Sequence, residues 1–275
     1  MRFTVSCAVL FSALPLALAV AAAAPAFAGA AKASKPPVDL SADEIVKRAL
    51  DKGSIGFKRG EATLRMTLTT ATGEAKERTL DIRAMRGEDG MFRSLVKFTK
   101  PADVNGTAFL VLEKKDALPD QYVFVPKAKV VRRIAAGNAS STFFGSDFTY
   151  GDLMPLPLSQ RDKVSVEKGP DTDVGGQPAY VLTILPKLEG SPYGKIIAYV
   201  HKELLVPLKI EFFDPQMKAL KTLKVKRLQK VGNETVPVEI EMKAEAGTRT
   251  DLVLEKVDPE AKLTDADFTE EAMQR

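Results

Sequence analysis

His201 is the only histidine of the 275-residue chain, and Cys7 is its only cysteine. A zinc site needs several such ligands, and a Ser-His-Asp triad would depend on His201 alone. His201 follows the apolar run IIAYV, which predicts the end of a surface strand. Ser146 lies in FGSDF, which lacks the G-x-S-x-G spacing of a nucleophile elbow. These residues predict that the protein is not an enzyme and that it has neither a metal site nor a cofactor.

Two acidic residues, Asp147 and Asp152, lie in the stretch FFGSDFTYGDL. They could form a carboxylate pair or a calcium site, but capping a turn is the commoner role of aspartate at such positions. Nearby, strand alternation in VVRRI places Arg132 and Arg133 on opposite faces. One arginine would then face the apolar side and need a partner. We expect that partner to be Asp147 or Asp152, so that the four polar residues fix the geometry of this segment.

The same stretch is rich in aromatic rings, and we call residues 143–153 the aromatic segment. Phe143, Phe144, Phe148 and Tyr150 lie among Gly, Ser and Asp residues that break any strand or helix period. A connection of this length is usually functional or disordered, and its rings and prolines favour order. Packing of the core is one alternative; a rim or lid over an apolar binding site is the other, and we favour the lid. On that reading Phe148→Asp should abolish lipid binding and leave folding almost unchanged.

The amino-terminal region has the features of a secretory signal peptide. A short positive start precedes an apolar run, and PAFAG supplies the small residues of a cleavage site after Ala28. We predict a cleaved signal over residues 1–28, a flexible linker over residues 29–38 and one domain over residues 39–275. The mature chain would have no cysteine, and no later apolar run is long enough to span a bilayer.

Charge and composition argue against a nucleic-acid surface. The 40 Lys and Arg residues and the 36 Asp and Glu residues are interspersed, and no basic block stands out. A nucleic-acid surface would need a concentrated basic patch with exposed aromatic rings. We therefore expect no nucleic-acid partner.

One helix and a long series of strands must position these side chains. In LSADEIVKRALDKG, residues 40–53, Ser41 and Glu44 form a capping box, and Leu40 can contact Ile45 across it. Afterwards apolar residues alternate with polar ones, as in ATLRMTLTT and VPVEIEMKA, with short turns between the runs. About a dozen such strands predict an antiparallel meander that curls to bury one apolar face.

Three ordered motifs resemble the outer-membrane lipoprotein-sorting proteins, the LolA-like family. They are KFTKPADVNGTAFLVLE, then DQYVFVPKAKVVRRI, then FFGSDFTYGDL. The resemblance implies an unclosed antiparallel β-barrel of about eleven strands, with helices plugging its open side. It adds Tyr122, Phe124 and Leu153 to the expected ligand-binding residues. The family often has tryptophan near Tyr122, whereas this chain has none.

The resemblance also implies a function. We expect a periplasmic carrier of lipid or lipoprotein acyl chains, which works with an inner-membrane transporter and an outer-membrane acceptor and touches membranes only transiently. The alternative is a periplasmic sensor of the same fold, which would detect lipid or lipoprotein and bind a signalling partner.

Overall fold

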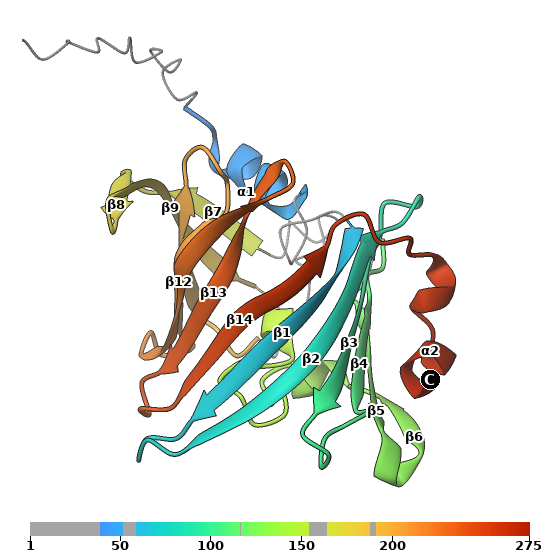
Figure 1. The fold of residues 1–275 in the computed structure, drawn as a ribbon. Helices are drawn as coiled ribbons and strands as arrows, with labels where there is room; N and C mark the ends of the chain where they lie inside the picture. The colour runs from blue at the N-terminus through green and yellow to red at the C-terminus, as the bar shows by residue number, and fades with distance from the viewer. Residues whose placement is uncertain (1–38, 52–58, 116, 154–163, 188–190) are drawn as a thin grey trace, which may run out of the picture. The chain divides into compact units, whose positions relative to one another are not determined.

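Fourteen strands form one antiparallel sheet in the computed structural model, which describes residues 39–51, 59–115, 117–153, 164–187 and 191–275 (Figure 1). The predicted signal peptide and linker lie outside the described residues. All described residues belong to one compact unit, Pro37–Arg275.

The bounds of the elements follow the chain. The strands are β1 (Arg59–Thr69), β2 (Ala75–Arg86), β3 (Phe92–Lys100), β4 (Ala108–Leu112), β5 (Asp120–Val125), β6 (Val130–Arg133), β7 (Val164–Lys168), β8 (Thr172–Val174), β9 (Gln177–Pro186), β10 (Lys195–His201), β11 (Pro207–Phe213), β12 (Ala219–Val231), β13 (Glu234–Ala244) and β14 (Arg249–Asp258). The α-helices are α1 (Ala42–Asp51) and α2 (Glu270–Gln274), and single 3-10 turns occupy Pro126–Ala128, Ala136–Asn138, Gly151–Leu153 and Asp265–Asp267.

The order of the strands confirms the predicted meander and its open edge. Neighbouring strands follow the order β6-β5-β4-β3-β2-β1-β14-β13-β12-β11-β10-β9-β7, and β8 pairs with β9. Pairing of β1 with β14 joins the first and last strands in the middle of the sheet. The two ends of the path, β6 and β7, are consecutive in the sequence. The connection between them contains the aromatic segment.

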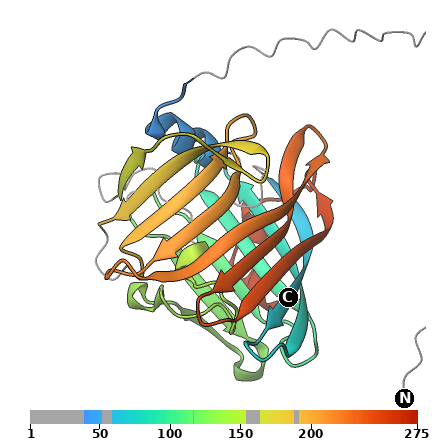
Figure 2. The ribbon, with the colours of Figure 1, turned by 90° about the vertical axis from the view of Figure 1, so that its left-hand side faces the viewer.

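The sheet curls (Figure 2), and strand alternation makes its concave face apolar. A cluster of buried side chains on this face brings together strands from both halves of the sheet, including Met66 of β1, Phe98 of β3, Phe212 of β11 and Met242 of β13. Side chains this far apart along the sheet can meet only because the sheet curls. The concave face is the setting of the candidate site.

The prediction of about eleven strands was wrong, because several strands carry no alternation signal. β6 and β8 have only four and three residues. β4 is the continuous apolar run AFLVL, and four of its five residues are buried. A strand covered on both faces has no polar side to mark it in the sequence.

The expected position of the carboxy-terminal helix was also wrong. α2 does not plug the open side of the sheet. Its Met273 joins Leu110 of β4 and Phe124 of β5 in a second buried cluster, on the face opposite the concave one. The segment that carries α2 thus covers the convex face of this half of the sheet, as Figure 1 shows at its edge.

Helix α1 begins as predicted. Glu44 accepts hydrogen bonds from the Ser41 backbone N–H at 3.0 Å and from the Ser41 hydroxyl at 2.8 Å, which is the capping box. Leu40 and Ile45 are buried with Tyr180 and Leu182 of β9, so the helix packs at the β7–β10 end of the sheet. No helix in the described part of the chain is long and apolar enough to cross a membrane.

Candidate functional site

The aromatic segment packs against the concave face rather than forming a rim. Phe143 and Phe148 are 3% and 6% exposed and belong to the concave cluster, whereas Phe144 and Tyr150 are half-buried against it. The Phe143 ring lies 5.3 Å from the Phe109 ring, measured between centroids. The two fully buried rings therefore pack in the core, which corrects the expectation of a rim for Phe143 and Phe148.

The segment itself is a miniature hairpin, which explains the absence of a regular period. Thr142 and Thr149 form an isolated bridge, and the Phe143 N–H donates to the Phe148 carbonyl at 2.7 Å. Between them Phe144 and Gly145 have positive φ angles of 49° and 76°. Glycine adopts this conformation at little cost, and it lets the chain reverse within two residues. The Ser146 hydroxyl donates to the Phe143 carbonyl at 2.7 Å and so has a structural partner.

Asp147 attaches the hairpin to β14. Its carboxylate accepts hydrogen bonds from the hydroxyls of Thr248 and, at 2.7 Å, Thr250. The Asp147 N–H donates in turn to the Thr250 hydroxyl at 2.9 Å. Thr250 is fully buried on the concave face, so the bond fixes the segment at a depth where water cannot substitute for it.

Asp152 forms a buried ion pair with Lys221 of β12. The Lys221 Nζ lies 2.5 Å from the Asp152 Oδ2, and the two side chains are only 7% and 5% exposed. Lys221 also donates to the Asp147 carbonyl at 2.9 Å. The Tyr193 hydroxyl donates to the other Asp152 oxygen at 2.6 Å. Burial, and then the Asp152 charge, raise the pKa of Tyr193, so this phenol stays a donor over the physiological range.

Two further side chains on the concave face hold backbone carbonyls of the segment. Arg78 of β2 donates to the Phe144 carbonyl at 2.5 Å, and burial lowers its pKa. Gln121 of β5 donates to the Tyr150 carbonyl at 2.9 Å. Together with the contacts to β12 and β14, these bonds connect the segment to strands in both halves of the sheet. The segment thus links the two halves of the sheet across the concave face.

The expected arginine partners of the two aspartates were wrong. Arg132 and Arg133 are both exposed, and Arg133 pairs with Asp120 instead. Both arginines can face water because β6 lies at one end of the sheet. The basic partner of Asp152 is Lys221, which stands two residues before Leu223 on the apolar side of β12. Arg78, which holds the Phe144 carbonyl, stands in the same way two residues before Leu80 on β2. A basic residue in register with an apolar stripe was the signal that could have found them.

The residues added by the family resemblance separate onto two faces. Phe124 is buried in the cluster under α2, and Tyr122 packs against that cluster, so both face the convex side. The alternate residues of β5, Gln121 and Val123, face the concave side. Leu153 is half-buried against the concave cluster.

His201 has a local structural partner. Its Nδ1 accepts hydrogen bonds from the N–H groups of Glu203 and Leu204, at 3.1 and 3.2 Å, in the turn after β10. Burial lowers its pKa, which favours the neutral ring that can accept these bonds. In the described residues, no group of three or more His, Cys, Asp or Glu side chains converges as a metal site would require.

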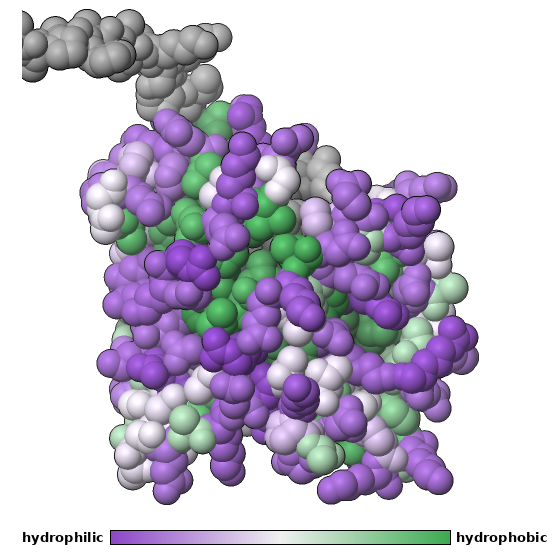
Figure 3. All heavy atoms as spheres, viewed as in Figure 1, coloured by the Kyte–Doolittle hydropathy of each residue, from purple (hydrophilic) through white to green (hydrophobic). Residues whose placement is uncertain are grey.

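Beyond the aromatic segment, the concave face carries aliphatic side chains that remain partly exposed. We call this set the apolar belt: Leu64, Ile82, Ile196, Ile210, Leu223 and Leu252. Each points inward with the core cluster, yet none is fully covered by the protein. An apolar surface left partly bare inside a curved sheet is the kind of surface that an apolar ligand covers. Hydrophobic side chains also gather in the middle of one face of the molecule, between hydrophilic ones (Figure 3).

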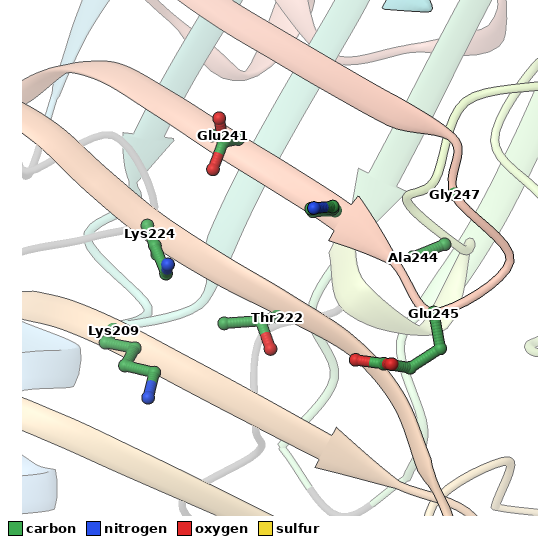
Figure 4. A pocket seen from close by; sticks show the side chains of 8 residues that line it. Lys209, Thr222, Lys224, Glu241, Ala244, Glu245 and Gly247 are labelled. Atoms are coloured by element: carbon green, nitrogen blue, oxygen red, sulfur yellow. The ribbon is translucent and has the colours of Figure 1, made fainter. Parts of the chain in front are cut away.

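A separate groove lies on the convex face of β11, β12 and β13 (Figure 4). It is polar and lined by Lys209, Thr222, Lys224, Glu241, Lys243, Ala244, Glu245 and Gly247. Several of its charges are paired, as Glu241 is with Lys226 at 3.2 Å and Lys209 is with Glu211 at 2.5 Å. An acyl chain would not be stabilised there. The apolar belt is the better candidate site.

Burial of Phe148 reverses the expectation drawn from a lid. Phe148→Asp should lower the free energy of unfolding by more than about 3 kcal/mol, because it removes a core ring and buries a charge. Urea denaturation followed by circular dichroism would measure the change, with Val130→Asp, at an exposed position, as the control. Equal, small losses in the two variants would show that the segment does not pack in the core.

The buried pair makes a second prediction. Lys221→Met should cost about 3–5 kcal/mol of unfolding free energy, because it leaves the Asp152 carboxylate buried without its cation. Lys224→Met on the same strand, at an exposed position, should cost less than about 0.5 kcal/mol. Denaturant titrations of both variants would test this difference. A loss below about 1 kcal/mol for Lys221→Met would contradict a role of the pair in holding the segment in place.

Solved structures with the same architecture include lipoprotein-sorting proteins. A Vibrio parahaemolyticus domain assigned to the outer membrane lipoprotein-sorting proteins is 28% identical, with a TM-score of 0.77 over 84% of this chain and 97% of that one. A DUF1329 family protein from Desulfovibrio piger is 24% identical, with a TM-score of 0.76 over 84% and 97%. A LolA superfamily protein from Nitrosomonas europaea is 18% identical, with a TM-score of 0.67 over 85% and 99%.

By sequence, the chain matches a family model. No curated protein matches the chain. Residues 90–275 match the model of a family whose description is "Uncharacterized protein", and they make up most of the chain. The resemblance inferred from the three motifs is confirmed. The chain belongs to this family, and it is LolA-like, with the fold of the outer-membrane lipoprotein-sorting proteins.

Proposed function

We propose that the protein is a carrier that binds the acyl chains of lipids or lipoproteins on its concave face. In this role it would pass them between envelope complexes toward the outer membrane. The similarity to the Vibrio parahaemolyticus lipoprotein-sorting domain supports the transport role. The apolar belt is the single observation that carries the proposal.

The belt suits an alkyl chain in both chemistry and placement. Its members are branched aliphatic residues contributed by β1, β2, β10, β11, β12 and β14. Each methylene moved from water onto such a surface contributes about 0.8 kcal/mol. The polar groups nearest the belt, on Asp147, Asp152 and Lys221, already bond to one another or to the protein. These groups would make few hydrogen bonds to a ligand. Binding would therefore depend on burial of the acyl chain and not on recognition of a specific head group.

We further propose that no covalent step is involved. The Ser146 hydroxyl and the His201 ring each have local hydrogen-bond partners in the fold. Binding and release would be driven instead by membrane complexes, because a buried acyl chain leaves slowly unaided. An inner-membrane transporter and an outer-membrane acceptor are the expected partners, and the predicted signal peptide supports a periplasmic location.

Adjacent isoleucines on β10 give a matched test. Ile196 pairs with Ile184 and faces the concave side, whereas Ile197 pairs with Glu211 and faces the convex side; both are half-buried. Ile196→Asn should weaken binding of cis-parinaric acid at least about tenfold, since an amide in the belt would be desolvated by the chain. Ile197→Asn should leave the affinity unchanged. Fluorescence titration of the signal-free protein would measure both.

Equal affinities of the two variants would contradict binding at the belt. Stoichiometric capture of a signalling protein, together with an unchanged distribution of lipids and lipoproteins in a deletion strain, would favour the sensor function instead. Thermal unfolding of both variants must be compared first, so that a loss of binding is not a loss of folding.

A further inference from the structure

The sheet has an internal seam between β13 and β14. The two strands pair only from Glu239 opposite Val253 to Lys243 opposite Arg249. Past that point residues 234–237 of β13 keep their pairing with β12, and residues 254 and 256–258 of β14 keep theirs with β1. No backbone hydrogen bond joins these two described stretches to each other. Figure 1 shows the two strands diverging.

We call the unpaired stretches of β13 and β14 the two arms of the seam. Each arm lies beside an irregularity in its pairing with the strand on its other side, β12 or β1. β12 and β13 change register on both sides of Arg227, and β1 and β14 change register between Thr63 and Leu64. Bulges of this kind add local twist to a strand pair. The ion pairs point the same way: Arg227–Glu239 ties β13 to β12, and Arg65–Glu255 ties β14 to β1.

Apolar side chains close the seam where hydrogen bonds do not. Val236 and Val238 of β13 are buried, and Leu254 and Val257 of β14 pack against them. Separating the two arms breaks only these non-directional apolar contacts, because no backbone hydrogen bond joins the arms. Each arm stays paired with its own neighbouring strand. An alkyl chain placed between the arms would replace these contacts with others of the same kind.

The seam leads directly to the apolar belt. Leu254 of the seam is the cross-strand partner of Leu64, which belongs to the apolar belt. Leu252, another member of the belt, lies two residues before Leu254 on the same face of β14. On the outside, the hydrophobic side chains of Figure 3 gather where the two strands diverge. One continuous apolar path therefore runs from the surface through the seam to the concave face.

We propose that the seam is the passage through which an acyl chain enters and leaves the concave face. The alkyl chain slides sideways between the arms, and its polar head stays outside in water throughout. This passage rests on the proposed acyl-binding function. It suits a ligand with a large head group, such as a lipoprotein, because the head never crosses the sheet.

Engineered cysteines can lock the seam. The chain has a single cysteine, Cys7, within the predicted signal, so the signal-free protein offers a background without thiols. Val238→Cys with Leu254→Cys places a disulfide across the seam. Glu241→Cys with Asp251→Cys places one between directly opposed residues where the same strands are paired. Stopped-flow fluorescence would follow the uptake of cis-parinaric acid by each oxidised protein and by its reduced form.

The passage predicts that the seam disulfide slows uptake at least about tenfold, that reduction restores the rate, and that the control disulfide changes nothing. An unchanged rate in the seam-locked protein would overturn it. A second pair of variants covers the case in which the seam disulfide does not form. Leu254→Gln, inside the seam, should slow uptake, whereas Val253→Gln, its outward-facing neighbour, should not; equal rates would overturn the passage too.

The outcomes for the passage and for the proposed function are distinct. A locked seam alters the rate of entry and leaves the equilibrium affinity of the belt intact, whereas Ile196→Asn lowers that affinity. Normal uptake by the locked protein would therefore reject the passage alone. If the unmodified protein binds no cis-parinaric acid, both the acyl-binding function and the passage fail.

Discussion

An open sheet with one apolar face must cover that face between its two free ends, and this constraint governs the rest of the structure. The ends here, β6 and β7, are consecutive in the sequence, so the connection between them is the segment that can reach across. It does so with aromatic rings, which cover a large area for each residue. The same rings leave the apolar belt only partly covered. Because this part of the apolar face is not filled by the protein itself, a ligand can bind there.

Polar bonds hold the segment in place because rings alone would not fix its position. Asp147 and Asp152 receive hydrogen bonds from Thr250, Lys221 and Tyr193, which lie in separate parts of the chain. A buried ion pair adds little net stability compared with apolar packing, but it is costly to break on one side. We therefore regard the pair as a device of specificity: it sets where the segment sits and so which part of the concave face stays open.

Much of the architecture was predictable from the sequence, since alternation of period two marks each long strand with one buried face. The capping box of Ser41 and Glu44 likewise fixed the start of α1 correctly. Long-range pairing was not predictable. Lys221 meets Asp152 across 69 residues of sequence, and only the curl of the sheet brings them together. The pattern of β5 placed Tyr122 and Phe124 on one side of the strand, but it could not tell which side faces α2.

Binding of acyl chains by the concave face is the central claim, and native mass spectrometry of the signal-free protein tests it most directly. After incubation with phospholipid vesicles and removal of the vesicles, the folded protein should carry a discrete added mass equal to one or more lipids. Organic solvent should release that mass, and the released molecule should contain acyl chains. A protein that keeps the mass of its sequence alone after this treatment would contradict the account.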